Sequence, residues 1–315
     1  MIPINMVDLV RVWGKRVGKI VTAVSTSESG FYTAVASKDK HVYLFDKKGT
    51  MKWYKKFDMP CTAVAVSPDG QYIIIAANYD VSCYTVDGST KWSAKLGGEA
   101  KRCAISRDSR KIGVAAADCH LHMFNDTGVL LWKYGTEGQA TCLGLNRDAT
   151  INSVGSTNGD VHILDSLGSR IKRLDFPFDI LSMDISGKGT KVLIGSYEKL
   201  ALVDLENDTK NTFETENWIK DVSMDHNPDL ILIGSMEMVS FFDGNFKPVY
   251  NLSPSGWAHA VHVTSNGKYI VVGYGEDHVD LYENRDAQKQ DTGPFEVTRE
   301  MWDELMLRID RLERG

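Results

Sequence analysis

The stretch CTAVAVSPDGQYIIIAANYDVSCYTVDGSTKWSAK, residues 61–95, contains four short strand patterns separated by turn residues. Residues 61–66 alternate small and apolar side chains, and the SPDG that follows them is typical of a β-turn. Residues 71–77 form a continuous apolar run rich in β-branched side chains, as expected of a strand buried on both faces. An Asp-Gly pair predicts a tight hairpin between a third strand at 81–86 and an outer strand at 89–96.

The same unit recurs along the chain. Each copy has small residues at the end of its second strand pattern: Ala36-Ser37, Ala76-Ala77, Ala116-Ala117, Gly155-Ser156, Gly195-Ser196, Gly234-Ser235 and, in the last copy, Gly273. Successive copies are 39 or 40 residues apart. Seven such units of short strands predict an all-β fold, a seven-bladed β-propeller in which each unit forms one four-stranded blade.

The seventh unit is one strand short, because it ends after the third strand pattern at 278–282. The missing strand is expected at the other end of the chain, where LVRVWGKR (9–16) resembles an outer strand. The number of residues between Trp13 and the first unit is the same as the number between Trp53 and the second unit. We therefore expect residues 7–17 to complete the seventh blade and to close the ring.

A tail, residues 286–315, follows the predicted propeller of residues 1–285 and consists of a linker and an amphipathic C-terminal helix. In the stretch 298–314, apolar residues at spacings of 3, 4 and 3 fall on one stripe of a helix: Trp302, Leu305, Ile309 and Leu312. A helix of this length is marginal alone in water. It is expected to dock on the propeller, to self-associate with another copy of the chain, or to insert into a partner.

Three units carry a tryptophan on the outer strand in a shared pattern: VASKDKHVYLFDKKGTMKWYKK (35–56), AANYDVSCYTVDGSTKWSAK (76–95) and AAADCHLHMFNDTGVLLWKY (115–134). These segments resemble the pyrroloquinoline-quinone-like repeat, and the resemblance implies that Trp53, Trp92 and Trp132 dock blade against blade. Blade length and order also resemble those of WD40 proteins, although the units lack that family's Gly-His and Trp-Asp pairing. The resemblance implies the fold and not a reaction, because one fold serves many functions.

No motif for a catalytic chemistry is present. The sequence contains no GxSxG, HExxH, Walker or GxGxxG pattern, and its five cysteines form no CxxC pair. His120 and His122 share one strand face, but such a pair is more often half-buried than metal-binding. The inner strands are expected to line the channel with Ala, Ser, Gly, Val and Cys. We therefore predict a protein that is not an enzyme, with no catalytic residue, metal or cofactor; an enzyme or small-ligand binder using the axial pocket is the alternative.

The composition is that of a soluble globular protein, with 43% hydrophobic and 25% charged residues. No apolar run is long enough to span a membrane and no signal peptide is recognisable, so a cytoplasmic location with reduced cysteines is expected. The isoelectric point of about 5.8 disfavours nucleic acid as the main ligand. Six basic residues form a candidate patch for an acidic partner or are simply solvated: Lys15, Arg16, Lys19, Lys52, Lys55 and Lys56.

Large aromatic residues gather in the loops that lead from one blade's outer strand to the next blade's inner strand. Phe176, Phe178, Trp218 and Trp257 lie in consecutive loops of this kind, and His259 follows closely. Exposed aromatic residues often anchor protein interfaces. Alternatively, the two tryptophans fill gaps between blades. We expect a non-catalytic protein-interaction scaffold, or an accessory subunit of a larger complex, that binds through these loops and the C-terminal helix.

Overall fold

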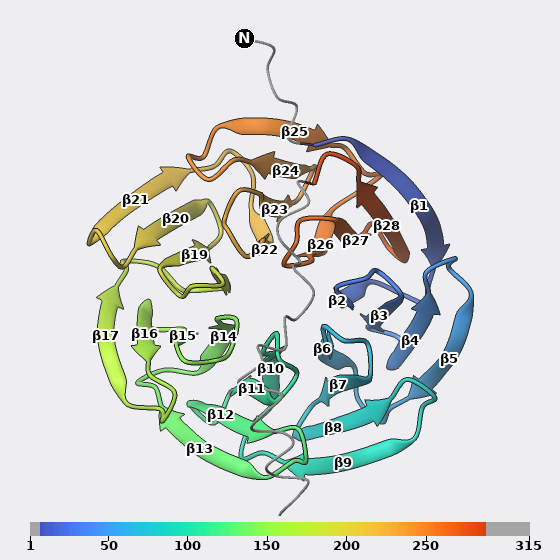
Figure 1. The fold of residues 1–315 in the computed structure, drawn as a ribbon, viewed down its shortest axis with the longest axis horizontal. Coiled ribbons are helices and arrows are strands. Elements are labelled where there is room, and N and C mark those ends of the chain that lie inside the picture. Colours follow the sequence, from blue (N-terminus) through green and yellow to red (C-terminus); the bar gives the residue numbers. More distant parts are fainter. Residues whose placement is uncertain (1–6, 288–315) are drawn as a thin grey trace, which may run out of the picture.

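Seven four-stranded antiparallel sheets surround a common axis in the computed structural model, which describes residues 7–287 (Figure 1). In six of these sheets the strands pair in chain order, from the inner strand beside the axis to the outer strand at the rim. Each of these blades is therefore one repeat unit of the sequence. The prediction of an all-β, seven-bladed propeller with four-stranded blades is confirmed.

The strands of the first four blades are β2 (Val21–Thr26), β3 (Tyr32–Ser37), β4 (His41–Asp46) and β5 (Met51–Lys56); β6 (Cys61–Val66), β7 (Tyr72–Ala77), β8 (Asp80–Thr85) and β9 (Thr90–Lys95); β10 (Ala100–Ile105), β11 (Lys111–Ala116), β12 (His120–Asn125) and β13 (Leu130–Gly135); and β14 (Ala140–Leu145), β15 (Asn152–Ser156), β16 (Asp160–Leu164) and β17 (Arg170–Asp175). The fifth and sixth blades contain β18 (Ser182–Ile185), β19 (Lys191–Gly195), β20 (Lys199–Asp204) and β21 (Thr209–Glu214); and β22 (Ile219–Met224), β23 (Ile231–Ser235), β24 (Val239–Phe242) and β25 (Pro248–Leu252). The seventh sheet contains β26 (Ala258–Val263), β27 (Tyr269–Tyr274), β28 (His278–Asn284) and β1 (Leu9–Arg16).

The seventh sheet joins both ends of the described chain. Strand β1 runs antiparallel to β28, from Leu9 opposite Asn284 to Arg16 opposite His278 (Figure 1). The side chain of Trp13 on β1 is buried, and its ring centroid lies 5.4 Å from that of Phe45 in the first blade. The outer strand of the seventh blade therefore contacts the neighbouring first blade.

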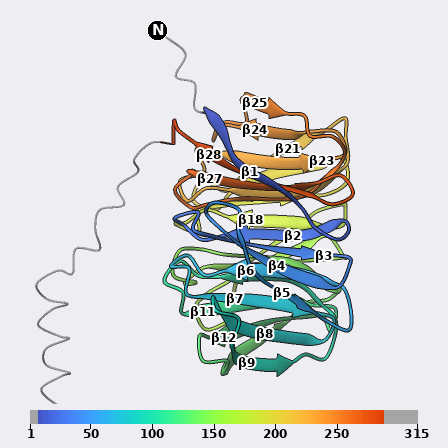
Figure 2. The same ribbon diagram turned by 90° about the vertical axis from the view of Figure 1, so that its right-hand side faces the viewer.

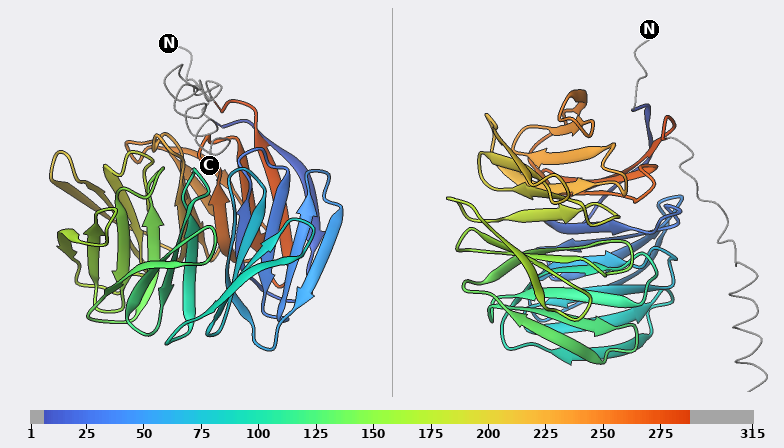
Figure 3. Two further views of the ribbon diagram at one scale, coloured as in Figure 1. Left: turned by 60° about the horizontal axis from the view of Figure 1, so that its bottom comes forward. Right: turned by 60° about the vertical axis from the view of Figure 1, so that its left-hand side comes forward.

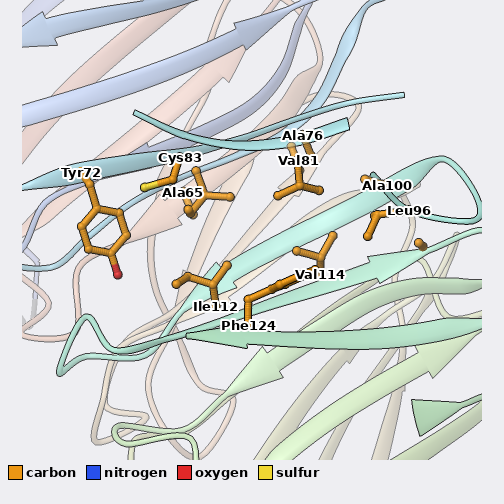
Figure 4. Packing of buried hydrophobic residues seen from close by; sticks show 13 residues of the cluster. Ala65, Tyr72, Ala76, Val81, Cys83, Leu96, Ala100, Ile112, Val114 and Phe124 are labelled. Carbon is orange, nitrogen blue, oxygen red and sulfur yellow. The ribbon is translucent and has the colours of Figure 1, made fainter. Parts of the chain in front are cut away.

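Apolar clusters between neighbouring blades form the core. Between the second and third blades, Ala65 and Val81 lie opposite Ile112, Val114 and Phe124, all of them buried (Figure 4). Similar clusters lie between the other neighbouring blades, including the seventh and the first. Burying one such aliphatic side chain contributes about 1.5–3 kcal/mol, so each interface between blades is held by many small apolar contributions.

Tryptophans of the outer strands bind each of three blades to the next. The indole Nε1 donates a hydrogen bond to a turn carbonyl of the following blade: Trp53 to Val86 at 3.0 Å, Trp92 to Asp126 at 3.0 Å and Trp132 to Ser166 at 3.1 Å. The ring of Trp92 also lies against Gly128, whose φ of 85° and lack of a Cβ allow the close approach. The expectation that these tryptophans dock blade against blade is confirmed.

The predicted C-terminal helix lies outside the described residues, and with it Trp302, Leu305, Ile309 and Leu312. Within residues 7–287 the structure contains no helix with the length and apolar character that a membrane crossing requires.

Candidate functional site

The strands run roughly along the axis, so that the molecule has two faces with different connections (Figures 2 and 3). On one, which we call the loop face, lie the loops between blades and the turns between the second and third strands. On the other, which we call the hairpin face, lie the hairpins between the first and second strands. Inner strands begin at the loop face and end at the hairpin face.

Exposed aromatic side chains from three consecutive blades, the fifth to the seventh, cluster on the loop face. Exposed fractions are 48% for Tyr197 and 44% for both Trp218 and Trp257. The rings of Tyr197 and Trp218 meet edge to face with centroids 5.6 Å apart. The ammonium of Lys220 lies 5.4 Å from the ring centroid of Trp218 and 5.3 Å from that of Trp257, so that one cation contacts both indoles. Glu198 accepts a hydrogen bond from Trp218 Nε1 at 3.0 Å.

His259 extends this cluster beside Trp257, with ring centroids 6.1 Å apart. Its Nε2 lies 3.1 Å from the carbonyl oxygen of Gly275. The pKa of His259 is lowered below its ordinary value, mainly because the imidazole is buried. The imidazole is therefore neutral near pH 7, and the positive charge of the cluster belongs to Lys220. We call Tyr197, Trp218, Lys220, Trp257 and His259 the tryptophan surface.

The repeat explains why the two tryptophans meet. Trp218 immediately precedes β22 and Trp257 immediately precedes β26, so that both occupy the same position in adjacent blades. Nearly half of each of these tryptophan side chains is exposed, so neither indole is enclosed in a gap between blades. Tyr197 and Lys220 also belong to the surface, although the loop aromatics of the sequence do not point to them. One feature of the sequence does distinguish Tyr197: it places a large ring at a turn position where the other units carry smaller residues.

Phe176 and Phe178 do not join the tryptophan surface. Phe176 is only 6% exposed and belongs to the apolar cluster between the fourth and fifth blades. Phe178 is half-buried against it, with ring centroids 5.3 Å apart. The ammonium of Lys210 lies 3.6 Å from the centroid of the Phe176 ring and covers it from outside. These two rings close the gap between their blades.

The central channel differs from the expectation that small and apolar residues line it. A cavity of about 250 Å³ lies on the axis, and its lining includes Arg102, Asp184, Asp221 and His262. Arg102 Nη2 lies 2.8 Å from Asp221 Oδ1, an ion pair that joins the third and sixth blades. The small residues that were expected do occupy the inner strands of other blades, where Ala63, Ala65, Cys142 and Gly144 stand at the equivalent positions.

Part of this polar lining has a structural role. Inner strands are sheet edges, and side chains of the preceding blade accept hydrogen bonds from their free backbone N–H groups. Met224 N donates to Asp184 Oδ2 at 2.9 Å, and Val261 N donates to Asp221 Oδ2 at 3.0 Å. Burial raises the pKa of Asp184 to about 6, and burial lowers that of His262 to about 4. The carboxylates of these blades therefore replace the strand partner that an inner edge lacks.

No metal site is recognisable in the part of the chain that the structure describes, because no group of three or more His, Cys, Asp and Glu has a suitable arrangement there. His122 Nε2 instead lies 2.9 Å from Asp118 Oδ2, and His120 Nδ1 lies 2.7 Å from the carbonyl oxygen of Asp118. All five cysteines are free thiols, and three of them are buried.

Comparison of the sequence with protein-family models gives no match, and comparison with curated proteins gives none either. At the level of fold, the seven four-stranded blades agree with a propeller of the WD40-like or pyrroloquinoline-quinone-like kind. What the chain shares with known proteins is therefore the architecture of a seven-bladed β-propeller.

Proposed function

We propose that the chain is a non-catalytic protein-interaction propeller, a scaffold or accessory subunit of a larger cytoplasmic complex, and that the tryptophan surface is its contact site. The observation that carries this proposal is the pair Trp218 and Trp257, each 44% exposed and held side by side by Lys220. Tryptophan is among the residues most enriched at the energetic centres of interfaces. Two indoles that are already arranged in the free protein lose little conformational entropy on binding.

The charge of the tryptophan surface indicates the chemistry of the partner. Within residues 7–287, Lys220 contacts the two indole rings and forms no ion pair with a carboxylate. A partner segment that carries an apolar side chain beside a carboxylate complements this arrangement, since the apolar group covers the indoles and the carboxylate approaches the ammonium. The free thiols of the five cysteines support the cytoplasmic location, because such thiols persist in a reducing compartment.

The tail supplies the second contact of the proposal. Trp302, Leu305, Ile309 and Leu312 share one stripe of the predicted helix, and a helix that carries such a stripe needs a surface to cover it. Insertion of this stripe into the same partner gives the complex two contacts on one chain. Docking on the propeller and self-association are the other outcomes that the experiment separates.

The test compares partner capture by the wild-type chain, the double variant W218A/W257A, the variant Y54A and a chain that ends at Asp291. Tyr54 is 59% exposed on the outer strand of the first blade and serves as the matched aromatic control. A captured protein is then purified, and its affinity for each chain is measured. The proposal predicts a loss of affinity of about tenfold or more for W218A/W257A, as expected for an energetic centre, and no change for Y54A.

Equal affinity of the partner for the wild-type chain and W218A/W257A would contradict the proposed contact. Thermal unfolding is the folding control. Because exposed indoles contribute little to stability, the double variant should have the same melting temperature as the wild type. A loss of affinity in the chain that ends at Asp291 would show that the tail contacts the partner. A change in oligomeric state of that chain assigns it to self-association instead.

A further inference from the structure

A ring of seven equivalent residues surrounds the axis at the hairpin-face end of the axial cavity. Each comes from the hairpin after the inner strand of its blade, and all line the cavity: Glu28, Pro68, Arg107, Arg147, Gly187, His226 and Ser265. Backbone hydrogen bonds connect successive members: Arg107 N to Arg147 O at 2.7 Å, Arg147 N to Gly187 O at 3.1 Å, Gly187 N to His226 O at 2.8 Å and His226 N to Ser265 O at 2.9 Å. This part of the cavity mouth is therefore rigid.

Basic side chains are concentrated on one side of this ring. Arg107 and Arg147 are consecutive members, and His226 lies two places further on. Burial first, and then the charges of Arg107, Arg147 and Lys188, lower the pKa of His226. The side chain of His226 lies over Gly187, where a Cβ would approach Nδ1 to 1.5 Å. Arg107, Arg147 and His226 thus occupy three of four consecutive places on the ring and line the same cavity.

Nothing on the ring neutralises the two arginines. The carboxylate of Glu28 is occupied on the other side, where it accepts hydrogen bonds from Ser265 N at 3.2 Å and Asn266 N at 2.9 Å. Within residues 7–287 neither Arg107 nor Arg147 forms an ion pair, whereas Arg102, deeper in the same cavity, is paired with Asp221 at 2.8 Å. Two unpaired guanidinium groups at the mouth of a cavity attract an anion.

The geometry points to a binding site for a small phosphate ester, and we propose that Arg107, Arg147 and His226 hold its phosphate. The planar guanidinium donates two parallel hydrogen bonds to phosphate oxygens, and two cations match a dianionic phosphate better than a single carboxylate. The cavity of about 250 Å³ behind the mouth accommodates only a small molecule. Asp184, Ser223 and His262 make the deeper lining polar, so the body of the ligand carries hydroxyl groups.

This site lies on the face opposite to the tryptophan surface and involves none of its residues. The proposed protein contact and the proposed phosphate site therefore stand or fall separately. Loss of partner binding in W218A/W257A leaves the phosphate site intact, and loss of the phosphate site leaves the tryptophan surface intact.

The test measures binding of glycerol 3-phosphate, inorganic phosphate and glycerol to the full chain by calorimetry, with thermal unfolding as a second readout. The matched pair of variants is R107Q/R147Q and R110Q. Arg110 is exposed on the same hairpin as Arg107 but does not line the cavity. We expect glycerol 3-phosphate to bind more tightly than inorganic phosphate, glycerol not to bind, R107Q/R147Q to lose about tenfold or more in affinity, and R110Q to bind like the wild type.

Each of the following results would overturn the proposal. The first is an affinity for glycerol 3-phosphate that is the same in R107Q/R147Q as in the wild type, or no binding of any phosphate at millimolar concentration. The second is equal affinity for inorganic phosphate and glycerol 3-phosphate, because the cavity then holds no ligand body. The third is tighter binding of a phosphoserine peptide than of glycerol 3-phosphate, which assigns the arginines to a phosphorylated protein. If R107Q/R147Q fails to fold, the single variants R107Q and R147Q each remove one guanidinium, and each must weaken the binding of glycerol 3-phosphate relative to R110Q.

Discussion

A buried carboxylate in the sixth blade, Asp225, occupies a position where most other blades carry a hydroxyl group. In the second blade the Oγ atom of Ser67 accepts hydrogen bonds from Gln71 N and Tyr72 N, both at 3.0 Å. Asp225 Oδ1 accepts the equivalent bonds from Asp229 N at 2.9 Å and Leu230 N at 3.2 Å. Burial raises the pKa of Asp225 to about 7, because a charge at this position has lost its water.

Replacement of this carboxylate by serine is expected to stabilise the protein at pH 8. In D225S the hydroxyl makes the same two hydrogen bonds as Ser67 without burying a charge. In the wild type, the pKa raised from 3.8 to about 7 means that the folded state keeps a proton which the unfolded state releases, so that stability is lost as the pH rises from about 4 through 7. The advantage of D225S should therefore grow over this range, as measured by denaturant unfolding at several pH values.

The matched control for this prediction is S186A. Ser186 Oγ accepts from Thr190 N and Lys191 N, so its loss removes the hydrogen bonds without changing a charge. S186A should cost about 1 kcal/mol at every pH. The account of Asp225 is contradicted if D225S is less stable than the wild type at pH 8, or if its effect does not depend on pH.

At the scale of elements, the outer-strand tryptophans hold neighbouring blades together. Trp92 donates to Asp126 O and packs on Gly128, so that one side chain joins two sheets by a hydrogen bond and an apolar contact. Trp13 on β1 makes the same apolar contact with Gly49 of the first blade, whose φ is 76°. We propose that β1 closes the ring by this contact and by its pairing with β28.

Truncation of Trp92 tests whether the outer-strand tryptophans hold neighbouring blades together. W92A should lower the free energy of unfolding by about 3 kcal/mol, since it removes a large packed ring. W92F should lower it less, because it keeps one packed ring and loses the hydrogen bond and part of the indole contact. The matched control W257A removes an exposed indole and should leave stability unchanged. Equal stability of W92A and W257A in denaturant unfolding would show that the indole contact does not hold the blades together.

Deletion of β1 tests the closing role. A chain that lacks residues 1–17 leaves β28 as an exposed edge and removes Trp13 from the apolar cluster between the seventh and first blades. We expect a marked fall in melting temperature and a tendency of the chain to associate through the exposed edge. A control chain that lacks only residues 1–6 keeps β1 and should melt like the full chain. Unchanged melting after deletion of residues 1–17 would refute ring closure by β1.

What could be predicted from the sequence depends on how local the signal is. The repeat and the strand order are properties of one unit, and the docking role of Trp92 follows from the resemblance of that unit to a known repeat; the structure agrees with all three. Whether an aromatic side chain in a loop is buried or exposed cannot be predicted from one unit alone. Phe176 is buried in the core whereas Trp257 remains exposed, although both lie in loops between blades. The pairing of Arg102 with Asp221 joins residues 119 positions apart, and no strand pattern within one unit indicates it.

At the scale of the whole molecule, the two proposed sites of the propeller share no residue. The tryptophan surface lies on the loop face, where aromatic rings and one lysine are exposed. Arg107 and Arg147, at the mouth of the axial cavity, lie at the hairpin face. The blades between them are rigid, closely packed sheets, so each site is arranged before its ligand arrives. Such a molecule suits the assembly of a complex, because a fixed platform loses little conformational entropy on binding.

Site-specific photo-crosslinking tests the central claim, that the tryptophan surface contacts a protein partner, most directly. A photoreactive aromatic amino acid replaces either Tyr197, which is 48% exposed on this surface, or Tyr54, which is 59% exposed on the first blade. The account predicts that position 197 crosslinks to one partner in cells, that W257A abolishes this product, and that position 54 gives no such product. Crosslinking of the same partner from both positions, or none from position 197, would contradict it.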